Sequence, residues 1–528
     1  MKEILGEEVI EEEEYYKFTW AGKAQARREA NKPSTGTLRP DKDESVNWDK
    51  TQNLYIEGDN LEVLKLMQKT YAGKVKMIYI DPPYNTGSDF VYKDNYKDNL
   101  KNYQELTGQV DDEGRKMTTN TESRGRYHSN WLNMMYPRLR LARNLLSDDS
   151  VIFMSIDDHE IENLKKISNE IFGENNLIGM FSIRSTPNAR DYGHIGKMHE
   201  YCLFYSKKHN LTETYHLPDF NKKFKYADDL GKFNIHPLYN SNEAFNIENR
   251  PNLYYPFFIY LGEEKDTNGF FKIGLESKEN SIEIYPPLSN ENGIQFVWRW
   301  GKDKSLKNLN KEIVGYKTSE NEYRIVQKMR TSKKVIRSIF DKKSVSSRRG
   351  TAEVEKLFKR KIFSFPKPLN LILDFLKAST INNDIVLDFF SGSGTTAHAV
   401  MALNAEDGGN RRHIQVQLPE PTDQKSEAYK AGYETLTEIG KERIRRAGNQ
   451  ILKELDEQIE KKQNKLDKLK EKGDDEDKIE SLTIDINEIK ERKDKLDIGF
   501  KVFKLDSSNI KAWSARTENL KENLLSPA

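Results

Sequence analysis

Two stretches of the chain alternate short apolar runs with segments of helical periodicity. In the first stretch, apolar runs at 54–56 and 75–80 each precede a segment in which apolar residues recur every three or four positions. Runs at 151–156 and 201–205 continue this pattern, and a second stretch repeats it over 369–418. Strands that alternate with helices in this way are typical of a parallel sheet covered by helices. The pattern therefore predicts an α/β fold.

Three parts of the chain depart from this rhythm. Residues 1–50 are polar and weakly patterned, which predicts an arm with little core of its own. Aromatic residues, Asn, Gly and Lys dominate 207–355, which indicates a separate domain of short strands and long loops. Apolar residues return at helical spacing over 449–497, where a polar break at 473–477 predicts two antiparallel helices with an architectural role. The predicted organisation is an arm (1–50), a first α/β half (51–206), the separate domain (207–355), a second α/β half (356–448), a helical hairpin (449–497) and a C-terminal segment (498–528).

The composition indicates an intracellular protein of several domains. A chain of 528 residues is too long for one compact core. No segment approaches the roughly 20 apolar residues that a membrane-spanning helix needs, and the acidic N-terminus lacks the basic start and apolar run of a secretory signal. We therefore expect a cytoplasmic protein with no membrane partner. The single cysteine, Cys202, excludes intramolecular disulfides and cysteine-rich zinc sites, and we predict no metal site.

The net charge of +1 conceals a basic block. From Arg299 to Lys361 there are 20 Lys and Arg against 7 Asp and Glu, a local excess of 13. Such a block can neutralise the phosphates of a nucleic acid, but it can equally be a solvated, charge-rich surface. The charge alone does not separate these interpretations, so the motifs on either side of the block decide its meaning.

The first of these motifs is Asp81-Pro82-Pro83-Tyr84, which directly follows the predicted strand 75–80. In an open α/β sheet, ligands bind at the carboxyl ends of the strands. The two prolines remove two backbone donors and leave carbonyl oxygens free to accept hydrogen bonds. A carboxylate and a carbonyl that converge suit an NH₂ group, and the tyrosine offers a flat face for a base. By itself the tetrapeptide is also compatible with an ordinary turn.

The second motif, which we call the glycine loop, covers 388–396 and reads Asp-Phe-Phe-Ser-Gly-Ser-Gly-Thr-Thr. Its glycines allow a tight turn and a close approach of the backbone to a ligand, and the following helix directs free N–H groups to the same place. Dinucleotide and phosphate sites are rival interpretations. Ala397 and His398 stand where a dinucleotide motif has its third glycine, and the chain has no Gly-Lys-Ser/Thr sequence. Glu420 is either an acceptor for ribose hydroxyls or a surface residue.

Together the two motifs resemble those of the DNA amino-methyltransferases, in the circularly arranged group where Asp-Pro-Pro-Tyr precedes the glycine loop. The resemblance covers 53–206 and 356–420. Within that group, 79–87, 363–368, 387–396 and 497–506 are similar to modification subunits of type III restriction systems. The resemblance implies a Rossmann-like S-adenosylmethionine-dependent methyltransferase fold, in which 207–355 is an inserted target-recognition domain and the helical hairpin is C-terminal.

The resemblance also implies roles for single residues. Asp81 accepts from the N6 amino group of adenine, the Pro82 carbonyl is the second acceptor, Pro83 completes the motif and Tyr84 stacks on the flipped base. Asp59 either lines the same cleft or caps a turn, and Lys367 either lines it or lies at the surface. The implied cofactor-binding residues are Asp388, Phe390, Ser391, Gly392, Gly394, Thr395, Glu420 and Lys367.

The implied activity is methylation of adenine N6 in double-stranded DNA with S-adenosylmethionine as cofactor. The implied partners are DNA, a second copy of the chain and a restriction/helicase subunit. Methylation at cytosine C5 needs a thiolate nucleophile, and Cys202 lies in a predicted strand, where a lone cysteine is usually a core residue. Three alternatives remain open: methylation of the cytosine N4 amino group, methylation of RNA or a protein amide, and a non-catalytic scaffold that keeps a decayed methyltransferase fold.

Overall fold

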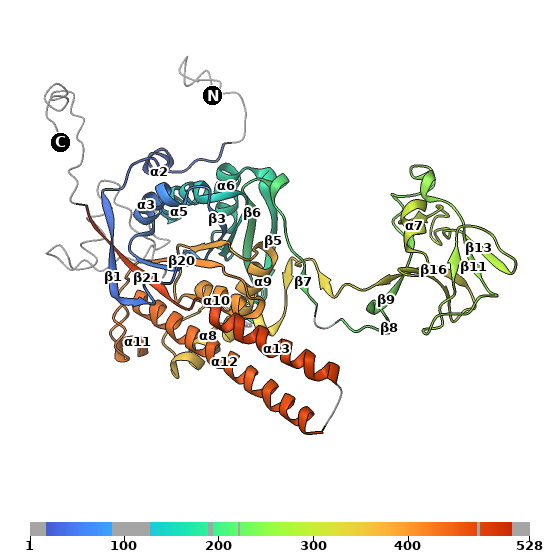
Figure 1. Cartoon of the computed structure of the whole chain (residues 1–528). Coiled ribbons are helices and arrows are strands. Elements are labelled where there is room, and N and C mark those ends of the chain that lie inside the picture. The colour runs from blue at the N-terminus through green and yellow to red at the C-terminus, as the bar shows by residue number, and fades with distance from the viewer. Residues whose placement is uncertain (1–16, 87–126, 188–193, 220–221, 473–475, 509–528) are drawn as a thin grey trace, which may run out of the picture. The chain divides into compact units, whose positions relative to one another are not determined.

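The computed structural model of the chain describes residues 17–86, 127–187, 194–219, 222–472 and 476–508. It divides into two compact units, which are described separately (Figure 1). Unit 1 comprises Met1–His216 and Val335–Ala528, and unit 2 comprises Leu217–Lys334. The separate domain predicted at 207–355 therefore includes all of unit 2, together with flanking residues that belong to unit 1.

Unit 1 is built on one large mixed sheet, which has ten strands within the described residues (Figure 1). The six strands β21, β2, β20, β19, β3 and β4 run parallel in that spatial order. Strand β1 is antiparallel to β21, and β6 is antiparallel to both β4 and β5. The predicted α/β fold is confirmed. The strands are β1 (Gly36–Val46), β2 (Leu54–Glu57), β3 (Val75–Ile80), β4 (Leu146–Ile156), β5 (Leu177–Ile183), β6 (Glu200–Ser206), β18 (Ile339–Phe340), β19 (Ile385–Asp388), β20 (Arg412–Gln417) and β21 (Phe500–Ser507).

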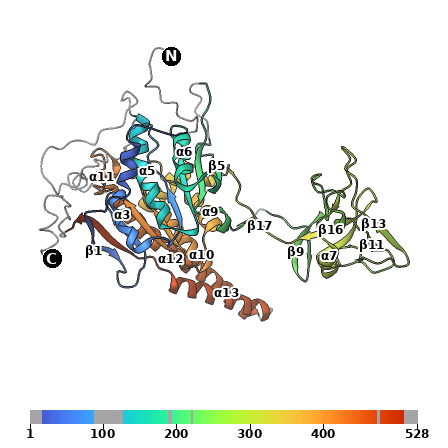
Figure 2. The ribbon, with the colours of Figure 1, turned by 90° about the horizontal axis from the view of Figure 1, so that it is seen from above.

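Helices cover both faces of this sheet, as the two ribbon views show (Figures 1 and 2). All six residues of β3 are buried, because alternate side chains serve two different cores. Ile78 and Ile80 pack with the helices α3, α5 and α6, whereas Met77 and Tyr79 pack with α9 and α10. Within the described residues, no helix is both long and apolar enough to span a membrane. The helices of unit 1 are α2 (Lys23–Glu29), α3 (Asn60–Tyr71), α5 (Tyr127–Leu145), α6 (Ile161–Phe172), α8 (Ser347–Phe358), α9 (Leu369–Ser379), α10 (Thr395–Asp407), α11 (Glu427–Lys430), α12 (Leu436–Lys472) and α13 (Glu476–Lys495).

The order of the strands reverses between β3 and β19, which are parallel neighbours. From β3 the chain continues through α5 to β4 on one side, and from β19 it continues through α10 to β20 on the other. The helices α5 and α10 lie on opposite faces, so the loops after β3 and β19 diverge. This divergence is the topological switch point at which open α/β sheets bind ligands. Both motifs found in the sequence begin at these two strand ends.

The first edge of the sheet differs from the sequence-based expectation. Residues 1–50 were expected to contribute little structure; the first 16 lie outside the described residues, but 36–46 form the edge strand β1. This strand pairs with β21 from the C-terminal segment, with Leu38 opposite Leu505. Its sequence contains Pro40 and several charged residues instead of an apolar alternation. Edge strands tolerate such residues because one of their sides has no neighbour, so the apolar pattern does not reveal them.

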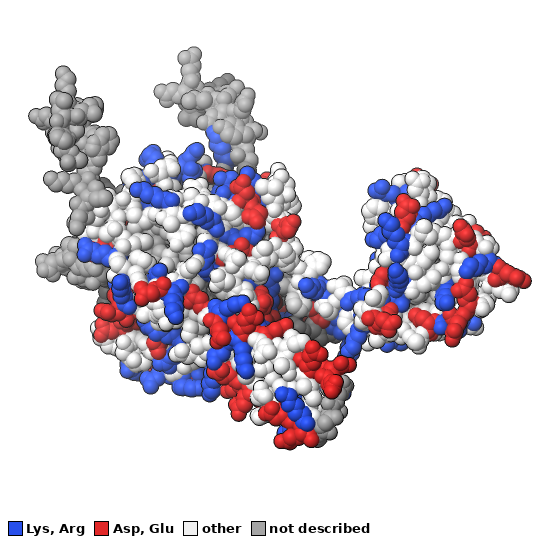
Figure 3. All heavy atoms as spheres, in the orientation of Figure 1, with Lys and Arg blue, Asp and Glu red and all other residues white. Residues whose placement is uncertain are grey.

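The helical pair predicted at 449–497 is present as α12 and α13, but α12 begins earlier, at Leu436. Before its start, the Glu438 carboxylate accepts from the backbone N–H of Thr435 at 3.1 Å, which is one of the two bonds of a capping box. Lys493 bonds to Asp456, and Lys462 bonds to Asp485, so the two helices are antiparallel. Residues 473–475 of the predicted break lie outside the described residues. On the face shown in Figure 3, acidic and basic side chains are interspersed over this hairpin, which fits a solvated architectural element.

Unit 2 consists of short strands and long connections around an aromatic core. Phe257, Trp298 and Ile325 are among its buried residues. Two small antiparallel sheets, ordered β15-β16-β9-β8 and β12-β11-β13, form most of its regular structure. Its elements are β7 (Leu217–Pro218), β8 (Tyr226–Asp228), β9 (Gly231–Pro237), β10 (Tyr239–Asn240), β11 (Phe257–Tyr260), β12 (Ile273–Gly274), β13 (Ser281–Ile284), β14 (Val297–Trp298), α7 (Lys302–Asn308), β15 (Ile313–Lys317), β16 (Tyr323–Met329) and β17 (Lys333–Lys334).

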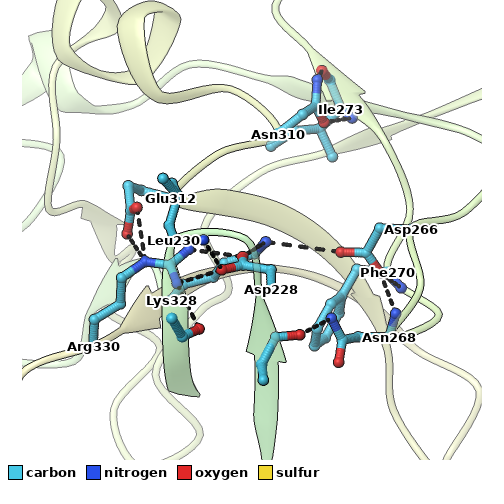
Figure 4. Close-up of polar contacts among 12 residues, drawn as sticks. Asp228, Leu230, Asp266, Asn268, Phe270, Ile273, Asn310, Glu312, Lys328 and Arg330 are labelled. Atoms are coloured by element: carbon cyan, nitrogen blue, oxygen red, sulfur yellow. Dashed lines mark hydrogen bonds and ion pairs between the residues drawn. The ribbon is translucent and has the colours of Figure 1, made fainter. Parts of the chain in front are cut away.

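An ion-pair network fastens one sheet of unit 2 (Figure 4). Arg330 donates to both oxygens of Asp228, at 2.6 and 2.8 Å, and its Nε donates to Glu312 at 2.9 Å. Lys328, almost fully buried, also bonds to Asp228, at 2.8 Å. The hydrogen bonds from Arg330 hold the pKa of the Asp228 carboxyl well below its usual range. Lys328 and Arg330, two residues of the basic block, therefore form ion pairs within unit 2 and contribute to its folding.

Two buried histidines of unit 1 make its stability depend on pH. His413 in β20 and His398 in α10 are buried, and burial lowers the pKa of each to about 3. The unfolded chain binds a proton at each histidine near pH 6.5, but the folded chain does not. The two neutral rings therefore contribute their full stabilisation above pH 6.5, the ordinary pKa of histidine in the unfolded chain. This stabilisation is lost as the pH falls, by up to about 1.4 kcal/mol per pH unit for each histidine.

We expect the variant His413→Gln to show a weaker fall in melting temperature between pH 7 and pH 5 than the wild-type protein. Burial raises the pKa of Asp388 to about 7, so the contribution of Asp388 to stability grows as the pH falls, opposite to that of the histidines. Both proteins contain Asp388, so the difference between them reports His413 alone. The variant His209→Gln provides a matched control, because it replaces an exposed histidine and leaves both buried rings in place. Equal pH dependence of the His413→Gln and wild-type proteins would contradict the assignment.

Candidate active site

The Asp-Pro-Pro-Tyr motif begins where the buried strand β3 ends. Asp81 follows Ile80 directly, and its side chain is 28% exposed. The Pro83 carbonyl accepts a hydrogen bond from the indole N–H of Trp131 in α5, at 2.7 Å, which fixes the turn against the helix. No hydrogen bond from any described residue reaches the Pro82 carbonyl. The turn therefore leaves a carboxylate and one carbonyl as acceptors at the end of β3.

Lys367 joins this motif to a second carboxylate. Its Nζ donates to the hydroxyl of Tyr84 at 2.5 Å and to both carboxylate oxygens of Glu200 at 3.0 Å. The same Nζ lies 3.2 Å from Oδ1 of Asp81, which is an ion-pair contact without the alignment of a good hydrogen bond. The side chain of Lys367 is only 10% exposed, so the interpretation as a surface lysine is wrong.

The charge states of this cluster follow from its burial. Burial alone would lower the pKa of Lys367, but the charges of Asp81 and Glu200 outweigh it and raise the pKa above its usual value. Burial raises the pKa of Glu200, and Lys367 offsets part of that effect. Burial also raises the pKa of the Tyr84 phenol well above its ordinary value, so it stays protonated and donates to Glu200 at 3.2 Å. With both carboxylates ionised, the cluster carries one net negative charge.

Glu200 is a site residue that the sequence analysis missed. The apolar run at 201–205 predicted the strand β6, but not its direction. Because β6 is antiparallel to β4, with Tyr201 opposite Ile156, the start of β6 lies beside the end of β4. Glu200 therefore reaches the same edge of the sheet as Asp81. A glutamate directly before a buried apolar run was the available signal, since such a carboxylate needs a partner when it is desolvated.

The glycine loop follows β19 in a conformation that its own residues fix. Asp388 accepts from the backbone N–H of Phe390 at 3.1 Å and from the hydroxyl of Thr396 at 2.6 Å, so both of its oxygens hold the loop. Gly392 and Gly394 have φ angles of +49° and +81°, which favour glycine. A Cβ atom at Gly394 would also lie 3.2 Å from the carbonyl of Gly440 in α12. The glycines therefore serve both backbone conformation and close packing.

Arg443, which the sequence analysis did not identify, supports the loop from α12. Its buried guanidinium donates to the hydroxyls of Ser393 and Thr395, each at 2.6 Å, and burial lowers its pKa to about 10. Two other buried hydroxyls, those of Ser391 and Tyr55, interact with each other, but neither has a well-aligned hydrogen bond within the described part of the chain. Buried groups in this condition are costly, so the loop is suited to a ligand that supplies polar partners.

The two motifs approach one another at the sheet edge. Residues Val386 and Leu387 of β19 pair with Met77 and Ile78 of β3, so the loops that follow start side by side. Lys367 also spans the two motifs, because its backbone carbonyl accepts from the hydroxyl of Thr395 at 3.4 Å. The ammonium of this residue contacts Asp81, and its carbonyl contacts the start of α10.

Asp59 and Glu420 occupy different surroundings. Asp59 caps α3 by accepting from the N–H groups of Leu61 and Glu62, and it pairs with the buried Arg138 at 3.3 Å, which favours the capping interpretation. Glu420 lies beyond the end of β20 and is linked to the glycine loop through Gln417. The Gln417 amide donates to Glu420 at 3.5 Å and accepts from the Gly392 N–H at 2.8 Å.

Comparisons with known proteins agree with this geometry. A family model described as DNA methylase matches residues 75–439, a range that contains both motifs. The EcoPI Mod subunit of a type III restriction-modification enzyme, from Escherichia phage P1, is 36% identical over 84% of this chain and 69% of its own length. The type II methyltransferase M.KpnI of Klebsiella pneumoniae is 31% identical over 74% of this chain and 86% of its own.

Among solved structures, the M1.HpyAVI–SAM complex covers 74% of this chain and 98% of its own, with 13% identity and a TM-score of 0.30, a similarity too weak to bear on the fold. The family match spans more than half of the chain, and the EcoPI Mod subunit is similar over most of both sequences. The chain therefore belongs to the DNA methylase family.

Proposed function

We propose that this DNA methylase transfers a methyl group from S-adenosylmethionine to the N6 amino group of adenine in double-stranded DNA. One observation carries the proposal: the acceptors after β3 and the glycine loop after β19 begin at neighbouring ends of parallel strands, and Lys367 contacts both motifs. A methyl donor and an amino group must meet within bonding distance, and this edge offers polar groups suited to each.

At the substrate end, Asp81 and the Pro82 carbonyl are proposed to accept from the two N–H groups of the amino nitrogen. The lone pair of that nitrogen is delocalised into the purine ring, which makes it a poor nucleophile. Two acceptors favour a pyramidal nitrogen with a localised lone pair and stabilise the positive charge that grows on it. The anchored hydroxyl of Tyr84 fixes its ring for stacking on the base. The base must leave the duplex, which costs a few kcal/mol of unstacking.

At the cofactor end, the residues present fit a ligand that carries a carboxylate, an amine and ribose hydroxyls. The hydroxyl of Ser391 lacks a well-aligned partner, and the turn at Gly392 brings the backbone close to any ligand. Phe390, Gly394 and Thr395 are proposed to complete the surroundings, Asp388 to shape the loop, and Glu420 to accept from the ribose. When bound, the cofactor supplies a methyl group on a positively charged sulfur. After transfer, the nitrogen sheds a proton to Asp81 or to water.

Similarity to the EcoPI Mod subunit supports a place in a restriction-modification system. We infer that the chain acts as the modification subunit, with a restriction subunit as its partner and unit 2 as the part that contacts the DNA target. We also infer a dimer of the chain from the family resemblance. Similarity to M.KpnI supports methylation in a type II arrangement, so co-purification of the chain with a restriction subunit separates the two arrangements.

The identity of the methylated base tests the proposal directly. We expect DNA incubated with the protein and labelled S-adenosylmethionine to yield labelled N6-methyladenine after digestion to nucleosides and mass spectrometry. Labelled N4-methylcytosine would instead assign the amino-cytosine activity. If RNA or a protein competes successfully for the label, the proposed duplex DNA substrate is wrong, and cofactor binding without transfer would identify a scaffold.

The variant Asp81→Asn tests the acceptor role, because it keeps the shape of the side chain but removes its charge and one acceptor. We expect the rate of methyl transfer to fall by about 100-fold or more, the scale found when one preorganised partner of a transition state is removed. The dissociation constant of S-adenosylmethionine from isothermal titration should stay unchanged. Asp148→Asn is a matched control, because this exposed aspartate precedes the buried part of β4. Full activity of Asp81→Asn would refute the role.

A further inference from the structure

We propose that Glu200 is a positioning residue that neutralises Lys367, so that Asp81 faces the amino group with an uncompensated negative charge. This inference rests on the proposed function and deepens it. The family resemblance implies no role for Glu200 and groups Lys367 with the cofactor-binding residues. The structure places both residues next to Asp81. Asp81 follows the end of β3, Glu200 begins β6, and Lys367 lies in the segment that precedes α9.

The ammonium group of Lys367 makes its hydrogen bonds mainly to Glu200 and Tyr84. Lys367 has three protons to donate. Both oxygens of Glu200 lie 3.0 Å from Nζ, and the Tyr84 hydroxyl lies 2.5 Å from it. The contact with Asp81 is longer, at 3.2 Å, and is not aligned as a hydrogen bond. The ammonium therefore makes its well-aligned hydrogen bonds to Glu200 and Tyr84 and a weaker contact with Asp81, so the Asp81 carboxylate keeps acceptor capacity for a substrate.

The net charge of the cluster depends on Glu200. With both carboxylates ionised, the formal charges of Asp81, Glu200 and the ammonium of Lys367, which the ion pairs bring together, add up to −1. Without Glu200, the remaining ion pair would be neutral, and among the described residues Lys367 would keep Asp81 as its one carboxylate partner, beside the Tyr84 hydroxyl. The side chains of Lys367 and Glu200 are 10% and 11% exposed, so water screens their charges weakly. A net negative cluster stabilises the positive charge on the attacking nitrogen, whereas a neutral pair does so less.

A purely structural role for Glu200 is the competing explanation. In that case Glu200 would only satisfy a buried ammonium, since breaking such a pair is destabilising. The two explanations differ when Lys367 is absent. If Glu200 acts by neutralising Lys367, it has no favourable role in a Lys367→Met protein, where it adds a second buried carboxylate that competes with Asp81 for ionisation. If it is structural, its loss is harmful in both backgrounds.

The test compares the wild-type protein, Glu200→Gln, Lys367→Met and the double variant in single-turnover methylation of DNA. Glu200→Gln keeps the size of the side chain. We expect it to slow methyl transfer by roughly 30-fold, about 2 kcal/mol, with unchanged dissociation constants for S-adenosylmethionine and DNA. The same substitution should speed transfer in the Lys367→Met protein by about fivefold or more, a reversal of sign that reports direct coupling. Glu200→Asp, which keeps the charge, should recover part of the wild-type rate.

Each outcome decides the matter. Wild-type rates in Glu200→Gln, or slower transfer by the double variant than by Lys367→Met, would reduce Glu200 to a structural residue while leaving the methyltransferase proposal intact. Melting temperatures of all four proteins identify any loss that comes from unfolding. If Glu200→Gln does not fold, the comparison of the double variant with Lys367→Met still gives the sign. A wild-type protein that binds the cofactor but methylates no DNA would overturn the proposed function and this role with it.

Discussion

The arrangement of the site depends on one buried ammonium group. Burying Lys367 costs several kcal/mol unless its charge is paired and its protons are bonded. Asp81 and Glu200 supply the pairing, and the backbone carbonyl of Lys367 receives a hydrogen bond from Thr395. The residue therefore holds together the end of β3, the start of β6 and the start of α10. Neither strand end can shift independently without orphaning a charge, and a shift of α10 would break the hydrogen bond from Thr395.

This constraint explains how the site accommodates a large insertion. Unit 2, Leu217–Lys334, enters the chain between Glu200 and Lys367. Both residues belong to unit 1, where β6 pairs with β4 and β5, and where β18 pairs with β5 after the insertion. The strands on either side of the insertion therefore pair within the sheet of unit 1, and no described strand of unit 2 takes part in that sheet. Sequence changes within unit 2 can alter its surface while the geometry around Asp81 is preserved, which suits a unit proposed to select the target sequence.

The parts of the site that follow strands of known direction were predictable from the sequence. Asp81 and the glycine loop each follow an apolar run that leads into a helix, and such strands are parallel, so their ends meet. Glu200 was not predictable because the direction of β6 depends on its neighbours, which no local pattern encodes. Arg443 was hidden for a related reason: a charged residue on a long, charge-rich helix gives no local sign that its side chain is buried.

The two ends of the site differ in how their polar groups are satisfied, and this difference has chemical meaning. At the glycine loop, both oxygens of Asp388 bind the loop itself, and burial raises its pKa to about 7, so it ionises less readily than an ordinary aspartate. At the end of β3, the lysine is bonded mainly to Glu200 and Tyr84, and Asp81 keeps acceptor capacity. The chain thus concentrates negative charge where a nitrogen would become positive. A charge placed before the reaction needs no reorganisation during it, and preorganisation of this kind is usually the largest electrostatic contribution to a rate.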